Sequence, residues 1–69
     1  MAFYRNYVQP GMRVVGSDGN DVGEVLRLQP DGFVVRHPPG GAVSVPYDTI
    51  QNVMGNEIVL NVPASQLGT

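Results

Sequence analysis

Three residue types are missing from the 69-residue sequence: cysteine, tryptophan and lysine. Without cysteine, the chain can form neither a disulfide nor a thiolate zinc site. Without lysine, its strong cations are four scattered arginines, and its net charge is −2. Nucleic acids and anionic membranes bind proteins through a clustered positive field. The composition therefore argues against nucleic acid or a membrane as a partner.

Long apolar runs are also missing. No stretch approaches the roughly 20 apolar residues that span a bilayer, and the chain does not open with the pattern of a secretory signal. We therefore expect a soluble, cytoplasmic protein. A chain of this size buries only about 60% of the surface that it exposes when unfolded. A partner subunit would help such a chain to fold stably, because no disulfide is available.

The residues that are abundant favour strands. Twelve Val and two Ile stand against three Ala and four Leu, and β-branched side chains fit pleated surfaces better than helices. Nine Gly and six Pro supply frequent turn signals between the apolar segments. We therefore predict an all-β fold, a small antiparallel β-barrel of five to six strands with at most one short helical turn. The expected turns lie at Pro10-Gly11, Asp18-Gly19, Pro30-Asp31-Gly32, 38–41 and Gly55-Asn56.

These signals divide the chain into three parts. Residues 1–10 form an aromatic lead segment that ends at the Pro10-Gly11 breaker. Residues 11–62 form the β-barrel domain, and residues 63–69 are expected to be a frayed C-terminal tail.

Three local features refine the prediction for the barrel. The period of two breaks near Gly23, which predicts a β-bulge there. After Pro30, Gly32 is expected to take the left-handed conformation of a tight turn. Residues 47–53 are expected to form about one helical turn, capped by Asp48 or Thr49.

The order of these signals is similar to that of a known family. The matching elements are Gly11-Met12-Arg13-Val14, the turn and strand from Asp18 to Val25, and Val45-Pro46 followed by Ile50 and Val53. In these residues the sequence resembles the PRC-barrel superfamily. That superfamily includes the cytoplasmic domain of the photosynthetic reaction-centre H subunit, the C-terminal domain of a ribosome maturation factor, and stand-alone bacterial proteins of unknown function. The resemblance covers roughly residues 11–62 and is greatest to the stand-alone type. It implies a small barrel that docks other macromolecules or itself, without shared catalytic residues.

An acidic turn has part of the spacing of a calcium loop. Asp18, Asn20 and Glu24 supply oxygen atoms, but Val22 and Gln29 stand where two further oxygen ligands are required. We therefore expect an ordinary hairpin turn and no metal site.

His37 is the only histidine, so one chain cannot form a two-histidine metal site, and a Ser–His–Asp triad has no local support. Because Pro38 follows it, His37 is expected at a strand end that faces solvent or a partner. The sequence predicts no catalytic residue, no metal and no cofactor, and we expect that the protein is not an enzyme.

The lead segment contains three of the five aromatic residues, Phe3, Tyr4 and Tyr7. Phe3 and Tyr7 are one helical turn apart, and tyrosine combines apolar area with a polar group suited to interfaces. These three residues either cap an open end of the barrel or form an intermolecular contact. They are the candidate interface residues.

The function predicted from the sequence is that of a non-catalytic β-barrel interaction module of unknown specific role. It is expected to act through protein–protein contacts and to form a homo-oligomer. The sequence does not identify the partner protein. The alternative is an RNA or ribonucleoprotein-binding accessory protein. Small barrels often bind single-stranded nucleic acid, and one branch of the resembled family works on ribosomes. The acidic balance of the chain counts against this alternative.

Overall fold

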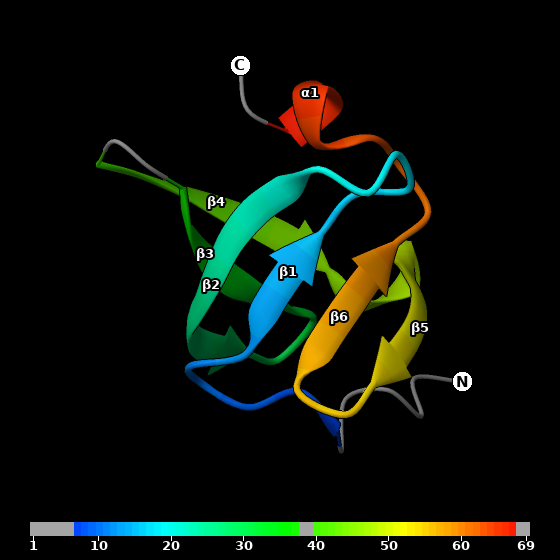
Figure 1. Cartoon of the computed structure of the whole chain (residues 1–69). Helices are drawn as coiled ribbons and strands as arrows, with labels where there is room; N and C mark the ends of the chain where they lie inside the picture. Colours follow the sequence, from blue (N-terminus) through cyan, green and yellow to red (C-terminus); the bar gives the residue numbers. More distant parts are fainter. Residues whose placement is uncertain (1–6, 38–39, 68–69) are drawn as a thin grey trace.

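A single six-stranded sheet forms most of the structure (Figure 1). The computed structural model describes residues 7–37 and 40–67. The strands are ordered β4-β3-β2-β1-β6-β5 across the sheet. The elements in chain order are β1 (Arg13–Val15), β2 (Asp21–Gln29), β3 (Gly32–His37), β4 (Gly41–Pro46), the 3-10 helix η2 (Tyr47–Thr49), β5 (Ile50–Met54), β6 (Glu57–Leu60) and α1 (Ala64–Leu67).

The all-β prediction is confirmed, but the closed antiparallel barrel is not. The sheet is open, with β4 and β5 at its two margins, and β1 pairs with β6 in parallel. The connection between β4 and β5 explains the difference. Pro46 ends β4 because proline offers no N–H to a ladder. The Tyr47 N–H then binds the Asp31 carbonyl at 3.2 Å, and η2 leads the chain away from β4 to the opposite margin.

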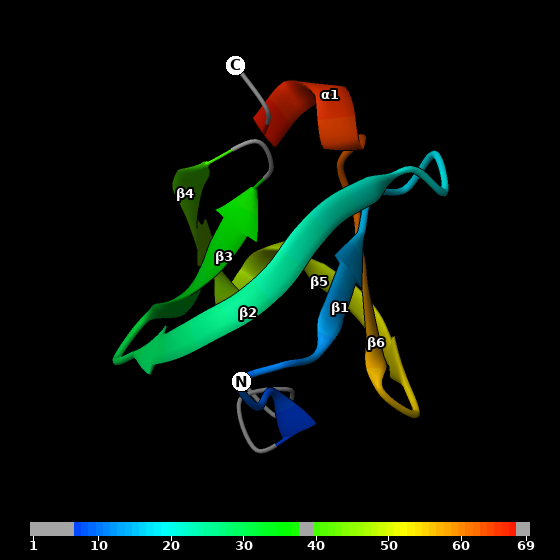
Figure 2. The same ribbon diagram turned by 60° about the vertical axis from the view of Figure 1, so that its left-hand side comes forward.

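The sheet curls around a core made largely of the β-branched residues that dominate the composition (Figure 2). Full burial of one such side chain contributes about 1.5–3 kcal/mol. Phe33 and Tyr47 are packed at a ring-centroid distance of 5.9 Å, and the Tyr47 hydroxyl donates to the Gln29 carbonyl at 3.0 Å. The core side chains with no exposed area are Val14, Val22, Phe33, Val35, Ile58 and Leu60.

Segments outside the predicted barrel also contribute to the core. Val8 precedes the barrel and is 2% exposed, and Ala64 follows it and is 7% exposed. Ala64 begins α1, where a frayed tail was expected. In the described residues, α1 is a short α-helix that occurs in addition to the 3-10 turn η2.

The turn between β1 and β2 is attached to the C-terminal segment. The Ser17 N–H donates to the Val62 carbonyl at 2.8 Å, and the Asp18 carboxylate accepts from the Ala64 N–H at 3.3 Å. The carboxylate also accepts from the Asn20 backbone N–H at 3.2 Å. This bond from Asn20 is the main reason that the pKa of Asp18 is lowered from its ordinary value of 3.8.

Three of the predicted turn features are confirmed. Gly19 and Gly55 have φ angles of +83° and +60°, which favour glycine in the two hairpin turns. The register between β1 and β2 shifts by one residue between Val14 and Val15, beside Gly23. A Cβ atom on Gly23 would collide with the Arg36 carbonyl oxygen. Glycine is therefore required at this bulge.

Two other local predictions were wrong. Gly32 does not take a positive φ; it begins β3, where a Cβ atom would collide with the Val45 carbonyl oxygen. Glycine is needed there for close approach of β3 and β4. The helical turn expected over 47–53 ends at Thr49, has Pro46 as its N-cap and has no side-chain cap. The rest forms β5, because pairing with β6 overrides the local signal.

Candidate functional site

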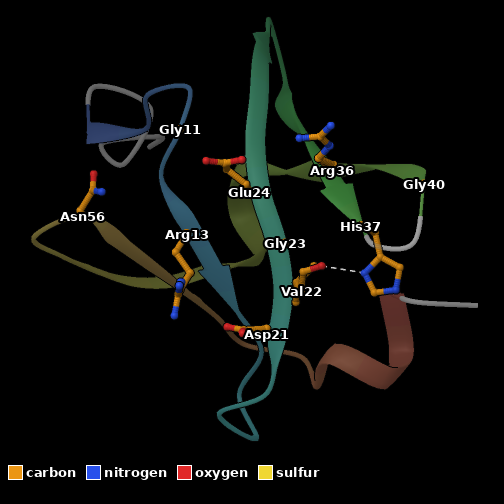
Figure 3. A pocket seen from close by; sticks show the side chains of 10 residues that line it. All are labelled: Gly11, Arg13, Asp21, Val22, Gly23, Glu24, Arg36, His37, Gly40 and Asn56. Carbon is orange, nitrogen blue, oxygen red and sulfur yellow. Dashed lines mark hydrogen bonds between the residues drawn. The ribbon is translucent and has the colours of Figure 1, made fainter.

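The outer face of the sheet has a row of alternating charges. Glu57, Arg13, Glu24 and Arg36 occupy matching register positions on β6, β1, β2 and β3. Figure 3 shows Glu24 on β2 between Arg13 and Arg36 on its two neighbouring strands. Opposite charges on adjacent strands contribute about 0.2–1 kcal/mol for each pair. The row of two acids and two arginines has no net charge.

An open groove of about 860 Å³ lies along this row. Because the groove combines two arginines with two acids, it offers no clustered field of either sign to a ligand. This balance agrees with the composition argument against a phosphate backbone as partner. The residues that line the groove are Gly11, Arg13, Asp21, Val22, Gly23, Glu24, Arg36, His37, Gly40 and Asn56.

His37 is half-buried at one end of the groove, at the end of β3. Its Nδ1 atom lies 2.6 Å from the Val22 carbonyl oxygen. Since a carbonyl only accepts, Nδ1 carries the proton, and in the neutral ring Nε2 is the acceptor. Val22 has no partner residue on β1, because the bulge skips it. This contact with the Val22 carbonyl fixes the orientation of the imidazole.

The chemistry available in the groove is limited to this imidazole and the surrounding charged groups. Among residues 7–37 and 40–67, no three His, Cys, Asp or Glu side chains are grouped closely enough to hold a metal ion. Within the same residues, no helix is long and apolar enough to cross a membrane.

Of the three aromatic residues predicted from the sequence, Tyr7 is 62% exposed. Phe3 and Tyr4 lie outside the described residues. In the part of the lead segment that is described, Val8 reaches the core instead of Tyr7. Leu26, Leu28 and Met54 are further large apolar residues with substantial exposure, between 42% and 56%.

The two margins of the sheet differ in a way that the sequence did not reveal. On β5 the register shifts between Ile50 and Asn52, and the Asn52 side chain accepts from the Val53 N–H at 2.9 Å. Bulges and local bonds of this kind hinder the addition of another strand.

At the other margin, β4 pairs with β3 over six consecutive residues without a shift. Its sequence, Gly-Ala-Val-Ser-Val-Pro, has no charged side chain. No described strand pairs with its outer side, and Figure 2 shows β4 at the edge of the molecule. Regular, uncharged edge strands are templates for further pairing. We refer to the outer side of Gly41–Pro46 as the β4 margin.

The fold and the site define a small β-rich domain whose most distinctive surface is a sheet margin. The chain belongs to a bacterial family described as an uncharacterized protein conserved in bacteria (DUF2171), whose model matches residues 8–67. The match begins at the buried Val8 and extends through α1. No curated protein matches the chain.

Proposed function

We propose that this domain is a non-catalytic interaction module that acts through protein–protein contacts, self-association among them. The observation that carries the proposal is the β4 margin, which combines regular register, lack of charge and an outer side with which no described strand pairs. An added strand would pair with its free backbone groups, and the alternating side chains would set specificity.

The likeness to PRC-barrels is part of this proposal. It is supported by the Asp18-Gly19 hairpin, the bulge beside Gly23 and the curled six-stranded sheet. A closed barrel has no free strand edges, whereas the sheet of this domain has open margins. A docking role is supported by the outer side of β4, because none of the strands in residues 7–37 and 40–67 pairs with it.

Affinity capture from bacterial lysate tests the proposal, with three tagged baits and with or without nuclease. The first bait is the wild-type chain. The second is Ser44→Lys, which places a charge at an exposed position on β4, where lysine hinders strand addition. The third is Ser65→Lys, the same change at an exposed serine on α1.

The proposal predicts partners, including untagged copies of the chain, that survive nuclease, are lost from Ser44→Lys and are retained by Ser65→Lys. Partners that are retained by all three baits would contradict a role for the β4 margin. Partners that disappear with nuclease would favour the RNA or ribonucleoprotein alternative. The salt dependence of binding to labelled RNA then checks that alternative, because phosphate contacts weaken steeply with added salt.

A further inference from the structure

We infer that the β4 margin pairs with the β4 margin of a second copy, antiparallel and across a two-fold axis that passes between the two Ser44 residues. This inference rests on the proposed function and deepens it by naming the partner and the register. The product is a dimer with one continuous sheet across both chains.

The first reason is the symmetry of the β4 sequence. In a two-fold interface, residue i of one chain contacts residue j of the other, and j contacts i in return. The three central residues are symmetric about Ser44, since Val43 precedes it and Val45 follows it. An axis at Ser44 therefore places Val43 of each chain opposite the partner's Val45. The two Ser44 residues then lie opposite each other.

The second reason is the way that the valines are packed. Val45 is buried, at 1% exposed, whereas Val43 on the same face is only partly covered and packs at the border of the core. Pairing in the proposed register brings a second valine beside Val43. Aliphatic side chains directly opposite on adjacent strands are within contact distance. The dimer would therefore continue the apolar layer of each chain.

The third reason is charge. Self-pairing of a charged strand across a two-fold axis sets like charges close together, which destabilises the pair. The uncharged β4 has no such penalty. The opposite margin is less suited to any added strand, because of the shift between Ile50 and Asn52 and the Asn52–Val53 bond. Because the paired segment is short, the dimer belongs to the small, transient class of interfaces.

A charge-swap experiment tests the axis directly. Sedimentation velocity over a wide concentration range would be measured for the wild type, Ser44→Lys, Ser44→Glu, an equimolar mixture of the two variants, and the control Ser65→Lys. Each Ser44 variant alone should dimerise at least about tenfold more weakly, because like charges face each other at the axis. The mixture should recover association, and Ser65→Lys should behave as the wild type. The circular dichroism spectrum and thermal midpoint of each variant verify that it is folded.

A cysteine trap supplies a second readout in a chain that has no cysteine of its own. Residues directly opposite in an antiparallel pair have Cα atoms about 4.5–5.5 Å apart, which suits a disulfide. Under mild oxidation Ser44→Cys should form a covalent dimer readily, and Ser65→Cys should form it slowly. Equal rates for the two variants would overturn the proposed register.

The outcomes separate this inference from the more general one. If the wild type remains monomeric at all concentrations, the dimer is wrong, whereas the proposed function stands if Ser44→Lys still loses captured partners. If a dimer forms but mixing Ser44→Lys with Ser44→Glu recovers nothing, the two-fold axis is wrong although self-association holds. If neither dimer nor β4-dependent partner exists, both proposals fail.

Discussion

Both margins of the sheet are strands without charged side chains, and they differ in how regularly their backbone groups are arranged. On β5, a register shift and the Asn52 side chain interrupt the row of backbone groups. On β4, six regular pairs with β3 leave the outer side uninterrupted. Since natural sheets commonly protect their edges, the unprotected β4 margin marks the surface where a partner is expected. The difference lies in hydrogen bonding rather than in hydrophobicity.

The largest expected effect is a loss of stability of the whole sheet, to which both margins belong. Gly23 lies on β2, between β1 and β3, and a Cβ atom there would collide with the Arg36 carbonyl oxygen. We expect Gly23→Ala to lower the free energy of unfolding by about 3 kcal/mol, because one strand must shift. Chemical denaturation measures this change. Gly40→Ala is the matched control, since a Cβ atom there would meet nothing within 4 Å, and a similar loss in that variant would contradict the explanation.

A smaller effect would distinguish how the two margins are anchored to the core. Val45 on β4 is buried, and Val53 on β5 is half-buried. We expect Val45→Ala to reduce the free energy of unfolding by about 2 kcal/mol and Val53→Ala by about 1 kcal/mol, because the cost increases with the cavity left behind. Thermal or urea unfolding of both variants gives the comparison. The reverse order would show that β5 is anchored more firmly than its burial indicates.

A third change would make the two margins more alike. Asn52→Ala removes the side-chain acceptor of the Val53 N–H. Because both residues are at least partly exposed and water replaces the acceptor, the loss of stability should stay within about 1 kcal/mol. Self-association measured by light scattering should rise or stay equal, since β5 becomes less protected. A fall in self-association would contradict this account, because loss of the Asn52 acceptor should weaken pairing at neither margin.

The smallest expected effect lies away from both margins, at Asp18. Its lowered pKa means that the folded state binds this proton less readily than the unfolded state. The stabilising contribution is therefore present above the ordinary pKa of 3.8 and is lost as the pH falls through the lower folded value. Acidification should speed hydrogen exchange at the Ala64 amide, the Asp18 partner on α1. In Asp18→Asn, hydrogen exchange at the Ala64 amide should show only the intrinsic pH dependence of the exchange reaction. An unchanged dependence would mean that the carboxylate does not hold α1.

The features that were predictable from the sequence are those set by a few neighbouring residues. The hairpins at Gly19 and Gly55 follow from local φ preferences, and the bulge beside Gly23 follows from a break in the apolar period. The parallel pair of β1 and β6 depends on contacts such as Val14 with Ile58, far apart in the chain. Local signals carry no information about such pairing.

The candidate site illustrates the same division. The exposure of Tyr7 agrees with an interface role that stays a prediction. The β4 margin could not be located from the sequence, because the edge strand is known only when the strand order is known. The orientation of His37 also depends on a residue far away in the sequence, Val22, whose carbonyl is its hydrogen-bond partner.

The most direct test of the difference between the margins is amide hydrogen exchange as a function of protein concentration. If β4 is the contact surface, the amides of residues 41–45 should exchange more slowly at high concentration, and those of 50–54 should not change. In the same concentration series, the Ser44→Lys variant should show no such slowing, because the lysine on β4 hinders strand pairing. Slowing in β5 alone would contradict the assignment of β4 as the docking surface, and slowing at neither margin across the whole concentration range would contradict the β4–β4 dimer.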